Sequence, residues 1–224
     1  MCNAAVIEFF IDRVDPSEFH GKRVLEVGSK YFNGSVRPFV ERFLKPKEYL
    51  GIDTEPGKFV DMMLPAEEIV RCFGEESFDI IISTELLEHV RNWRAVINNM
   101  KRALKKGGYT YITARSYGFS YHGYPYDFWR YEIDDVLKMF SDFEIIALTK
   151  DNLIPGVFLK ARKPLAYKPI DLSNIAIYSI VLGKRTFNMW SIEDMPFARR
   201  LNLRVSSSKL LRSILRTVLR VLQL

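Results

Sequence analysis

Short apolar runs alternate with longer segments of helical period along most of this chain, and this alternation limits the possible folds more than any other feature of the sequence. Seven runs are predicted to be strands, at 23–27, 49–52, 59–62, 78–83, 109–113, 143–148 and 156–161. Helices are predicted at 3–14, 36–44, 66–73, 92–104 and 132–140. The pair Gly107 and Gly108 is predicted to cap the helix over 92–104 in a left-handed conformation. Such an alternation predicts one α/β domain over residues 1–164, in which a mainly parallel seven-stranded sheet carries helices on both faces.

The charge of the chain is unevenly distributed. The whole sequence has a formal net charge of +6, but residues 165–224 hold ten Lys and Arg against three acids, a net charge of +7, which leaves −1 for residues 1–164. A basic surface over the whole protein, as in many nucleic-acid-binding domains, is therefore not expected. Two cysteines without metal-binding spacing, and no apolar leader before the first strand, predict a cytoplasmic protein. No segment is long and uncharged enough to be predicted to cross a membrane.

Two predicted strand ends carry residues suited to a nucleoside, because ligands of parallel sheets bind at the carboxyl ends of the strands. In "VLEVGSKYFNGS", Gly28 permits a sharp turn after the strand, with Glu26 beside it. In "YLGIDTEPG", Asp53 ends the strand 25 residues after Gly28, where a carboxylate can accept hydrogen bonds from two ribose hydroxyls. Lys30 stands where a dinucleotide needs a small residue, and no GxxxxGK(S/T) loop is present for a triphosphate. The sequence therefore predicts a nucleoside without phosphates.

Together these motifs resemble those of class I S-adenosylmethionine-dependent methyltransferases, especially the small methyltransferase type 11 group. The resemblance runs from about Arg23 to Lys163 and is carried by "VLEVG", "YLGID", "FDIIISTELLEHV" and "LKKGGYTYITARS". It implies a Rossmann-like fold and S-adenosylmethionine as the cofactor. The sequence departs from the group's pattern in its longer first loop, "EVGSKYFNGS", and at Pro65, where relatives often have an acid near the adenine amino group.

The resemblance also implies which residues bind the cofactor. Gly28 and Ser29 would lie under its methionine part, and Asp53 would hold the ribose. The remaining contacts fall on the adenine side and at the end of the fourth strand. The full set of implied cofactor-binding residues is Glu26, Gly28, Ser29, Lys30, Asn33, Asp53, Thr54, Leu64, Ala66, Glu67, Ser83 and Thr84.

The segment 115–135 is unusually aromatic. It holds five tyrosines, two phenylalanines and Trp129, interrupted by glycines and a proline, and is expected to fold over the mouth of the site. The type 11 group has a similar run after the fifth strand, where class I methyltransferases commonly build the acceptor site. The alternative is that the aromatic side chains only fill the core beneath the next helix. The residues expected to line the acceptor are Tyr121, Tyr126, Asp127 and Arg130.

Methyl transfer to oxygen or nitrogen also needs a group that takes up a proton. His122, in the aromatic segment, and His89, just after the fourth strand, are the candidates for this catalytic role. For His89 the alternative is a structural hydrogen bond to neighbouring backbone. A metal ion at His122 and Asp127 is not favoured, because the pair lacks further ligands, and no metal is expected.

Residues 165–224 are predicted to be a basic extension that ends in an amphipathic helix over 207–224. Leucines fall on one face of this helix and arginines on the other. This pattern favours docking on the domain, or on a second copy in a homodimer, over peripheral contact with an anionic membrane, and nucleic acid is the least favoured partner.

Two functions are left open by the sequence. The favoured function is an enzyme that transfers a methyl group from S-adenosylmethionine to a small-molecule or glycan-like acceptor. The alternative is a non-catalytic S-adenosylmethionine-binding module that acts as a membrane-associated or oligomeric partner.

Overall fold

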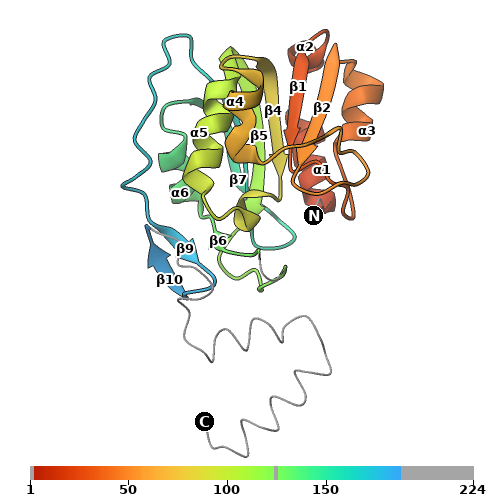
Figure 1. Ribbon diagram of the computed structural model, residues 1–224. Coiled ribbons are helices and arrows are strands. Elements are labelled where there is room, and N and C mark those ends of the chain that lie inside the picture. The colour runs from red at the N-terminus through yellow and green to blue at the C-terminus, as the bar shows by residue number, and fades with distance from the viewer. Residues whose placement is uncertain (1–2, 124–125, 188–224) are drawn as a thin grey trace, which may run out of the picture.

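The protein is built around a seven-stranded sheet, in a computed structural model that describes residues 3–123 and 126–187. The strand order is β3-β2-β1-β4-β5-β8-β7 (Figure 1). Strands β1 to β5 pair in parallel, whereas β8 runs antiparallel to both β5 and β7. The strands are β1 Arg23–Val27, β2 Glu48–Asp53, β3 Met62–Met63, β4 Phe78–Thr84, β5 Leu104–Arg115, β7 Glu144–Lys150 and β8 Gly156–Arg162. The predicted α/β fold with a mainly parallel seven-stranded sheet is therefore confirmed.

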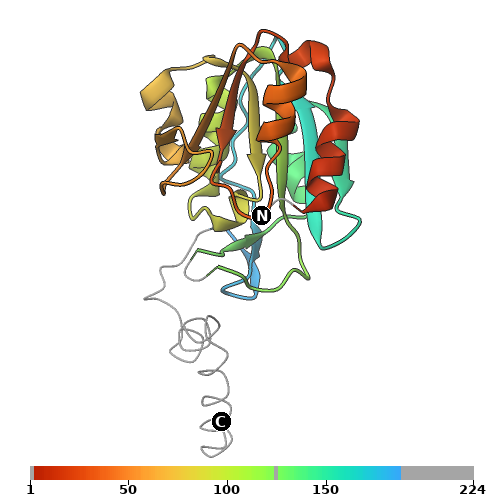
Figure 2. The ribbon, with the colours of Figure 1, turned by 90° about the vertical axis from the view of Figure 1, so that its right-hand side faces the viewer.

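Helices cover both faces of this sheet, with α1, α2 and α3 on one face and α4, α5 and α6 on the other (Figures 1 and 2). Short helical segments η1, η2 and η3 lie beside them in the chain, and η1 continues α3 with π-helical geometry. The bounds are α1 Ala4–Arg13, α2 Pro16–Phe19, α3 Arg37–Phe39, η1 Val40–Leu44, η2 Ala66–Glu68, α4 Ile69–Phe73, η3 Leu87–His89, α5 Trp93–Ala103 and α6 Ile133–Met139.

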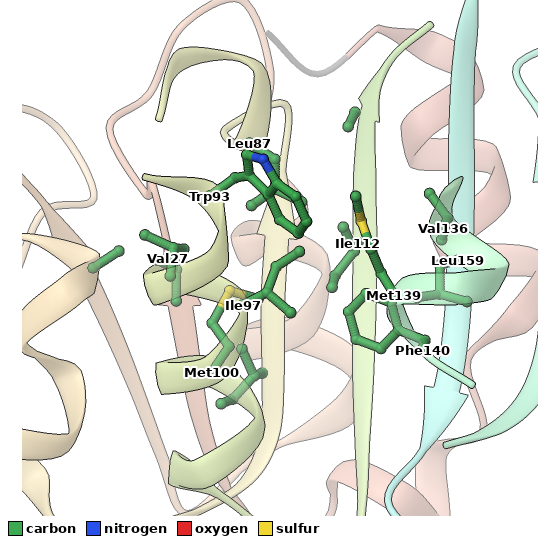
Figure 3. Close-up of a cluster of buried hydrophobic side chains, with 14 of the residues drawn as sticks. Val27, Leu87, Trp93, Ile97, Met100, Ile112, Val136, Met139, Phe140 and Leu159 are labelled. Atoms are coloured by element: carbon green, nitrogen blue, oxygen red, sulfur yellow. The ribbon is translucent and has the colours of Figure 1, made fainter. Parts of the chain in front are cut away.

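The largest hydrophobic cluster lies between the sheet and helices α4, α5 and α6 (Figure 3). The side chain of Asn92 accepts a hydrogen bond from a backbone amide of the first turn of α5, which explains where this helix begins. Its buried residues follow the three- and four-residue spacing of one helix face, at Trp93, Val96, Ile97 and Met100. A second cluster packs α1, α2 and α3 on the opposite face of β1 and β4. The central strands are therefore buried on both faces, as parallel sheets require.

The third strand is shorter than predicted. The apolar run predicted as a strand over 59–62 contains Phe59, whose φ of +72° lies in the left-handed region, and the strand begins only at Met62. A left-handed residue cannot continue a β-ladder, so the prediction for the first part of this run is wrong.

The glycine pair after α5 does not cap that helix. Leu104 follows α5 in an extended conformation and already begins β5. Gly107, with a φ of +78°, therefore lies inside β5, in a bulge where the pairing with β4 shifts register. A Cβ on Gly108 would lie 2.6 Å from the carbonyl oxygen of Asp79. The two glycines thus allow the bulge and the close approach of the strands, and the predicted left-handed helix cap is wrong.

A second, three-stranded antiparallel sheet joins the aromatic segment to the first part of the C-terminal extension. Its order is β10-β9-β6, with β6 Trp129–Arg130, β9 Ile177–Ser179 and β10 Lys184–Thr186. The predicted amphipathic helix over 207–224 lies outside the described residues. Within the described part of the chain, no helix has the length and apolar character needed to span a membrane.

Replacing Ile97 with alanine should lower the free energy of unfolding by about 2–5 kcal/mol, because this side chain is wholly buried in the main cluster and its removal leaves a cavity. Ile146→Ala is the matched control, since Ile146 is 49% exposed on β7, and it should change the stability by only about 0.5 kcal/mol. Urea denaturation of both variants measures the difference. Equal losses would contradict the assignment of the core.

Candidate active site

The carboxyl ends of β1, β2, β4 and β5 meet at one end of the sheet, and the small sheet lies beside this end (Figure 1). Two backbone hydrogen bonds connect the small sheet to it. The amide of Phe128 donates to the carbonyl of Glu88 at 2.8 Å, and the amide of Tyr131 donates to the carbonyl of Arg115 at 2.8 Å. The aromatic segment is therefore held against the ends of β4 and β5.

The turn after β1 depends on Gly28, whose φ is +80°. Its amide and that of Ser29 both donate to the carbonyl of Ile52, at 2.9 and 3.0 Å. A Cβ on Gly28 would lie 2.9 Å from Cδ1 of Leu86, so both conformation and space require glycine. The Ser29 hydroxyl is buried beneath Gly51 of β2 and has no hydrogen-bond partner in the described part of the chain.

Asp53, at the end of β2, is half-buried and oriented by backbone amides. Its Oδ2 accepts from the amide of Lys30 at 3.1 Å, and its Oδ1 accepts from the amide of Glu55 at 3.2 Å. A carboxylate oxygen has two lone pairs, so each oxygen retains the capacity to accept a second hydrogen bond. The Lys30 amine instead forms a 2.6 Å ion pair with Glu55, and both side chains are substantially exposed. Only the backbone of Lys30 therefore contacts Asp53.

Glu26 is buried in β1 and accepts a 2.9 Å hydrogen bond from the hydroxyl of Tyr49. Burial raises the pKa of Glu26 to about 8, although the hydrogen bond from Tyr49 and the nearby Arg37 both oppose this rise. Without a ligand, the Glu26 carboxyl is therefore largely protonated at neutral pH.

The other residues implied as cofactor contacts lie at the same end of the sheet. The amide of Leu64 donates to the carbonyl of Asp53 at 2.9 Å, which places the segment after β3 beside Asp53. The Ser83 hydroxyl is wholly buried and has no hydrogen-bond partner within the described ranges. Among the rest, Ala66 and Thr84 are buried, whereas Asn33, Thr54 and Glu67 are exposed.

Two buried acids after β4, Glu85 and Glu88, were missed by the sequence analysis. Glu85 has a φ of +56°, accepts a 2.8 Å hydrogen bond from the Thr113 hydroxyl and forms a buried ion pair with Arg115. Burial, and then the neighbouring Glu88 carboxyl, raise the pKa of Glu85 to about 7. Arg115 also forms a 3.1 Å ion pair with Asp151. The sequence feature that could have indicated Glu85 and Glu88 is the spacing of these two acids in "ELLEHV", directly after an apolar strand.

The two histidines predicted to take part in proton transfer are brought together. The ring centroids of His89 and His122 are 4.8 Å apart in an edge-to-face arrangement. Nδ1 of His89 forms a hydrogen bond with the carbonyl of Tyr126, and Nδ1 of His122 lies 3.1 Å from Oδ2 of Asp127. Burial lowers the pKa of His89, which favours its neutral form. The backbone partner of His89 is thus 37 residues away and does not belong to its own helical turn.

The residues expected to line the acceptor divide into two groups. Asp127 and Arg130 are both fully buried and paired through two hydrogen bonds of 2.6 and 2.8 Å. The guanidinium also donates to the carbonyls of Phe119 and Ser120, so the pair fixes the loop from inside. In contrast, Tyr126 is 61% exposed and Tyr121 is half-buried.

Together, the fold and the site define an α/β protein with a glycine turn and an oriented carboxylate at the ends of β1 and β2 and a histidine–carboxylate cluster beside the ends of β4 and β5. A family model described as "Methyltransferase domain" matches residues 4–152. The chain belongs to this family, and the resemblance to class I S-adenosylmethionine-dependent methyltransferases is confirmed.

Among curated proteins, the chain is 30% identical over 103 residues to a probable phthiotriol/phenolphthiotriol dimycocerosates methyltransferase 2 from Mycobacterium ulcerans (strain Agy99). This match covers 42% of the chain and 39% of the relative, so the chain aligns with well under half of that protein.

Solved structures with similar folds include a putative S-adenosylmethionine-dependent methyltransferase from Listeria monocytogenes, with a TM-score of 0.52, 13% identity, and coverage of 71% of this chain and 98% of that one. Another is the Burkholderia thailandensis 1,6-didemethyltoxoflavin-N1-methyltransferase with bound 1,6-didemethyltoxoflavin and S-adenosylhomocysteine. Its TM-score is 0.53 and its identity 13%, with coverage of 72% of this chain and 79% of that one. At these identities, the similarity supports the fold alone.

Glu26→Gln should stabilise the ligand-free protein at neutral and higher pH. The pKa of a glutamate in the unfolded chain is about 4.3, whereas burial raises the pKa of Glu26 to about 8 in the folded state. The folded state therefore loses stability as the pH rises between these values, and the loss is complete above the folded pKa. Glutamine still accepts from the Tyr49 hydroxyl but does not ionise. Thermal denaturation should show a gap in Tm in favour of the variant that is small near pH ~5 and grows toward pH ~8. A gap independent of pH would contradict this interpretation.

Proposed function

We propose that this chain transfers a methyl group from S-adenosylmethionine to a small-molecule or glycan-like acceptor. The observation that carries the proposal is the meeting of the Gly28 turn and the Asp53 carboxylate at neighbouring strand ends, in a chain of the methyltransferase domain family. The non-catalytic alternative has no comparable support, because the two histidines that would take up the acceptor proton lie together, 4.8 Å between ring centroids, at the same end of the sheet.

The side chains that would bind the methyl donor fit a nucleoside that carries no phosphate. Asp53 has acceptor capacity left for two ribose hydroxyls, and the Lys30 amine, which a phosphate would attract, is paired with Glu55. The buried Ser83 hydroxyl lacks a partner in the described residues, and a polar ligand would satisfy it. The protonated Glu26 lies in the strand that leads into the Gly28 turn, where a positively charged amino-acid part would favour its ionisation.

When bound, S-adenosylmethionine supplies a methyl carbon on a positively charged sulfur, and its transfer requires in-line orientation of the acceptor. The chain would contribute this orientation and the uptake of a proton. Asp53 would fix the ribose, while His89 and His122 would accept the acceptor proton through Nε2, since Nδ1 of each ring already has a partner. The exposed Tyr126 would offer an aromatic face to the acceptor.

The acceptor is proposed only as a chemical class. The names of the similar proteins give phthiotriol and phenolphthiotriol dimycocerosates for one and 1,6-didemethyltoxoflavin for another, which differ widely in chemistry. Both a hydroxyl and a ring nitrogen are therefore acceptor atoms to test.

The remaining proposals concern location and partners. We expect a cytoplasmic protein whose segment 207–224 docks on a second copy or on an anionic membrane surface. The charge and leucine pattern of the sequence supports this proposal, and the segment lies outside the described residues.

Asp53→Ala should weaken the binding of S-adenosylmethionine by about 1.5–3 kcal/mol, roughly 10- to 150-fold, because the ribose hydroxyls would lose a charged acceptor. Isothermal titration calorimetry with S-adenosylmethionine and S-adenosylhomocysteine measures the loss. Glu55→Ala is the matched control, since Glu55 is an exposed acid of the same loop, and it should leave the affinity within about twofold. Equal effects of the two substitutions would remove Asp53 from the binding site.

Turnover is tested by the release of S-adenosylhomocysteine in the presence of hydroxylated glycans, phenols and ring-nitrogen heterocycles. At least one acceptor class should give release of S-adenosylhomocysteine by the unaltered protein. This release should be lost when the acceptor is omitted, and it should be lost in Asp53→Ala although the Tm of this variant equals that of the unaltered protein. Tight binding of the cofactor with no release on any acceptor class would instead favour the non-catalytic module.

A further inference from the structure

Three side chains beside the ends of β4 and β5 form a cluster with the composition of a metal site. Glu88 and His89 come from η3, and His122 comes from the aromatic segment more than thirty residues later. One potential ligand atom from each residue lies within 4.8 Å of the others. The two ligands that the sequence analysis could not find for His122 are thus supplied by the fold.

The hydrogen bonds of both imidazoles fix the tautomer that metal-binding histidines commonly have. The partner of His89 Nδ1 is the carbonyl of Tyr126, which can only accept, so this nitrogen carries the proton. The partner of His122 Nδ1 is Asp127, whose two carboxylate oxygens also accept hydrogen bonds of 2.6 and 2.8 Å from the Arg130 guanidinium. A carboxylate paired with a guanidinium in this way also only accepts. In the neutral state, each ring therefore presents the lone pair of Nε2, and metal-bound histidines almost always donate their other nitrogen to a carbonyl or carboxylate in this way.

Glu88 supplies independent evidence for a missing ligand. Its side chain is wholly buried, and neither of its carboxylate oxygens has a hydrogen-bond partner in the described part of the chain. Buried polar groups are almost always satisfied, and a buried carboxylate without a partner is costly. The nearby guanidinium of Arg115 does not fill this need, because it is engaged by Glu85 and Asp151. A cation bound at Glu88 would satisfy both its charge and its lone pairs.

We propose that Glu88, His89 and His122 bind a divalent transition-metal ion of the Zn²⁺ type. Two imidazoles and one carboxylate are a common protein ligand set of catalytic zinc, and they leave a fourth position open. Mg²⁺ and Ca²⁺ are disfavoured because they prefer oxygen ligands. At Zn²⁺ bond lengths, tetrahedral ligand atoms lie about 3.4 Å apart, so ion binding would draw the three atoms closer together.

The open position would take a hydroxyl oxygen of the acceptor. The charge of the ion would lower the pKa of that hydroxyl, so that its proton could leave to solvent at neutral pH. This metal site goes beyond the proposed methyl transfer, and metal binding does not depend on it.

The test uses the full chain with both cysteines changed to serine, Cys2→Ser and Cys72→Ser, so that no thiolate can bind the metal. After treatment with a chelator, the protein is titrated with Co²⁺, a probe whose visible absorption reports its coordination, and then with Zn²⁺ by calorimetry. We expect one ion per chain, low-coordinate cobalt bands and displacement of Co²⁺ by Zn²⁺.

The variants separate the proposed ligands from their surroundings. Asp127→Asn, which alters the hydrogen-bond partner of a ligand, should weaken Zn²⁺ binding about 10- to 100-fold and keep one ion per chain. Glu88→Gln and His122→Ala, which remove a ligand, should each weaken it more than that. His20→Ala is the matched control, because His20 is an exposed histidine that is not part of the cluster, and it should bind as the parent does. Circular dichroism checks that each variant is folded, and the two ligand variants are independent should one fail to fold.

The absence of Co²⁺ binding to the parent, or binding that survives in both Glu88→Gln and His122→Ala, would overturn the proposal. Affinity for S-adenosylmethionine is measured on the same metal-free samples. A protein that binds cofactor but no metal therefore contradicts only the metal site, and the reverse result contradicts only the proposed cofactor.

Discussion

The two hydrogen bonds accepted by the carbonyl of Ile52 determine how the rest of the site is arranged. This oxygen receives the amides of Gly28 and Ser29, so the turn after β1 is fixed to the end of β2. Asp53 follows Ile52 and accepts the next amide of the turn, from Lys30. Backbone groups that leave a parallel ladder need new partners, and here they pair with one another. The loop that would lie under the methionine part and the acid that would hold the ribose are therefore joined by three hydrogen bonds.

Much of the fold was predictable because long strands and helices leave a periodic pattern. Strand β1 was predicted with its observed bounds, and the other main strands were shifted by a few residues at their ends. The failures have local causes. Phe59 adopts a left-handed conformation inside an apolar run, and Gly107 and Gly108 serve a β-bulge where glycines after a helix usually serve a cap. The small strand β6 has two residues, too few to show any period.

The site was less predictable because its decisive features depend on contacts between distant segments. Gly28 and Asp53 follow strands and could be found from their positions. Glu88, in contrast, looks in the sequence like an ordinary acid of a helical turn. In the fold its side chain is wholly buried, and its backbone carbonyl accepts a hydrogen bond from the amide of Phe128 in the distant aromatic segment. The two hydrogen bonds that Arg130 donates to Asp127 likewise lie inside the loop, whereas the sequence alone favours a polar pair in contact with the acceptor.

Charge balance beside the ends of β4 and β5 connects the proposed methyl transfer with the proposed metal site. Arg115 forms ion pairs with Glu85 and Asp151 and is not hydrogen-bonded to the buried Glu88 carboxyl. An unpaired buried charge is costly, so this carboxyl either keeps a proton or binds a cation. With the proton, Nε2 of His89 and of His122 is free to accept the proton of the acceptor. With a cation, both histidines are occupied as ligands, and the acceptor hydroxyl loses its proton because the ion lowers its pKa. The same three side chains thus support two routes for one proton, and the metal content of the protein decides between them.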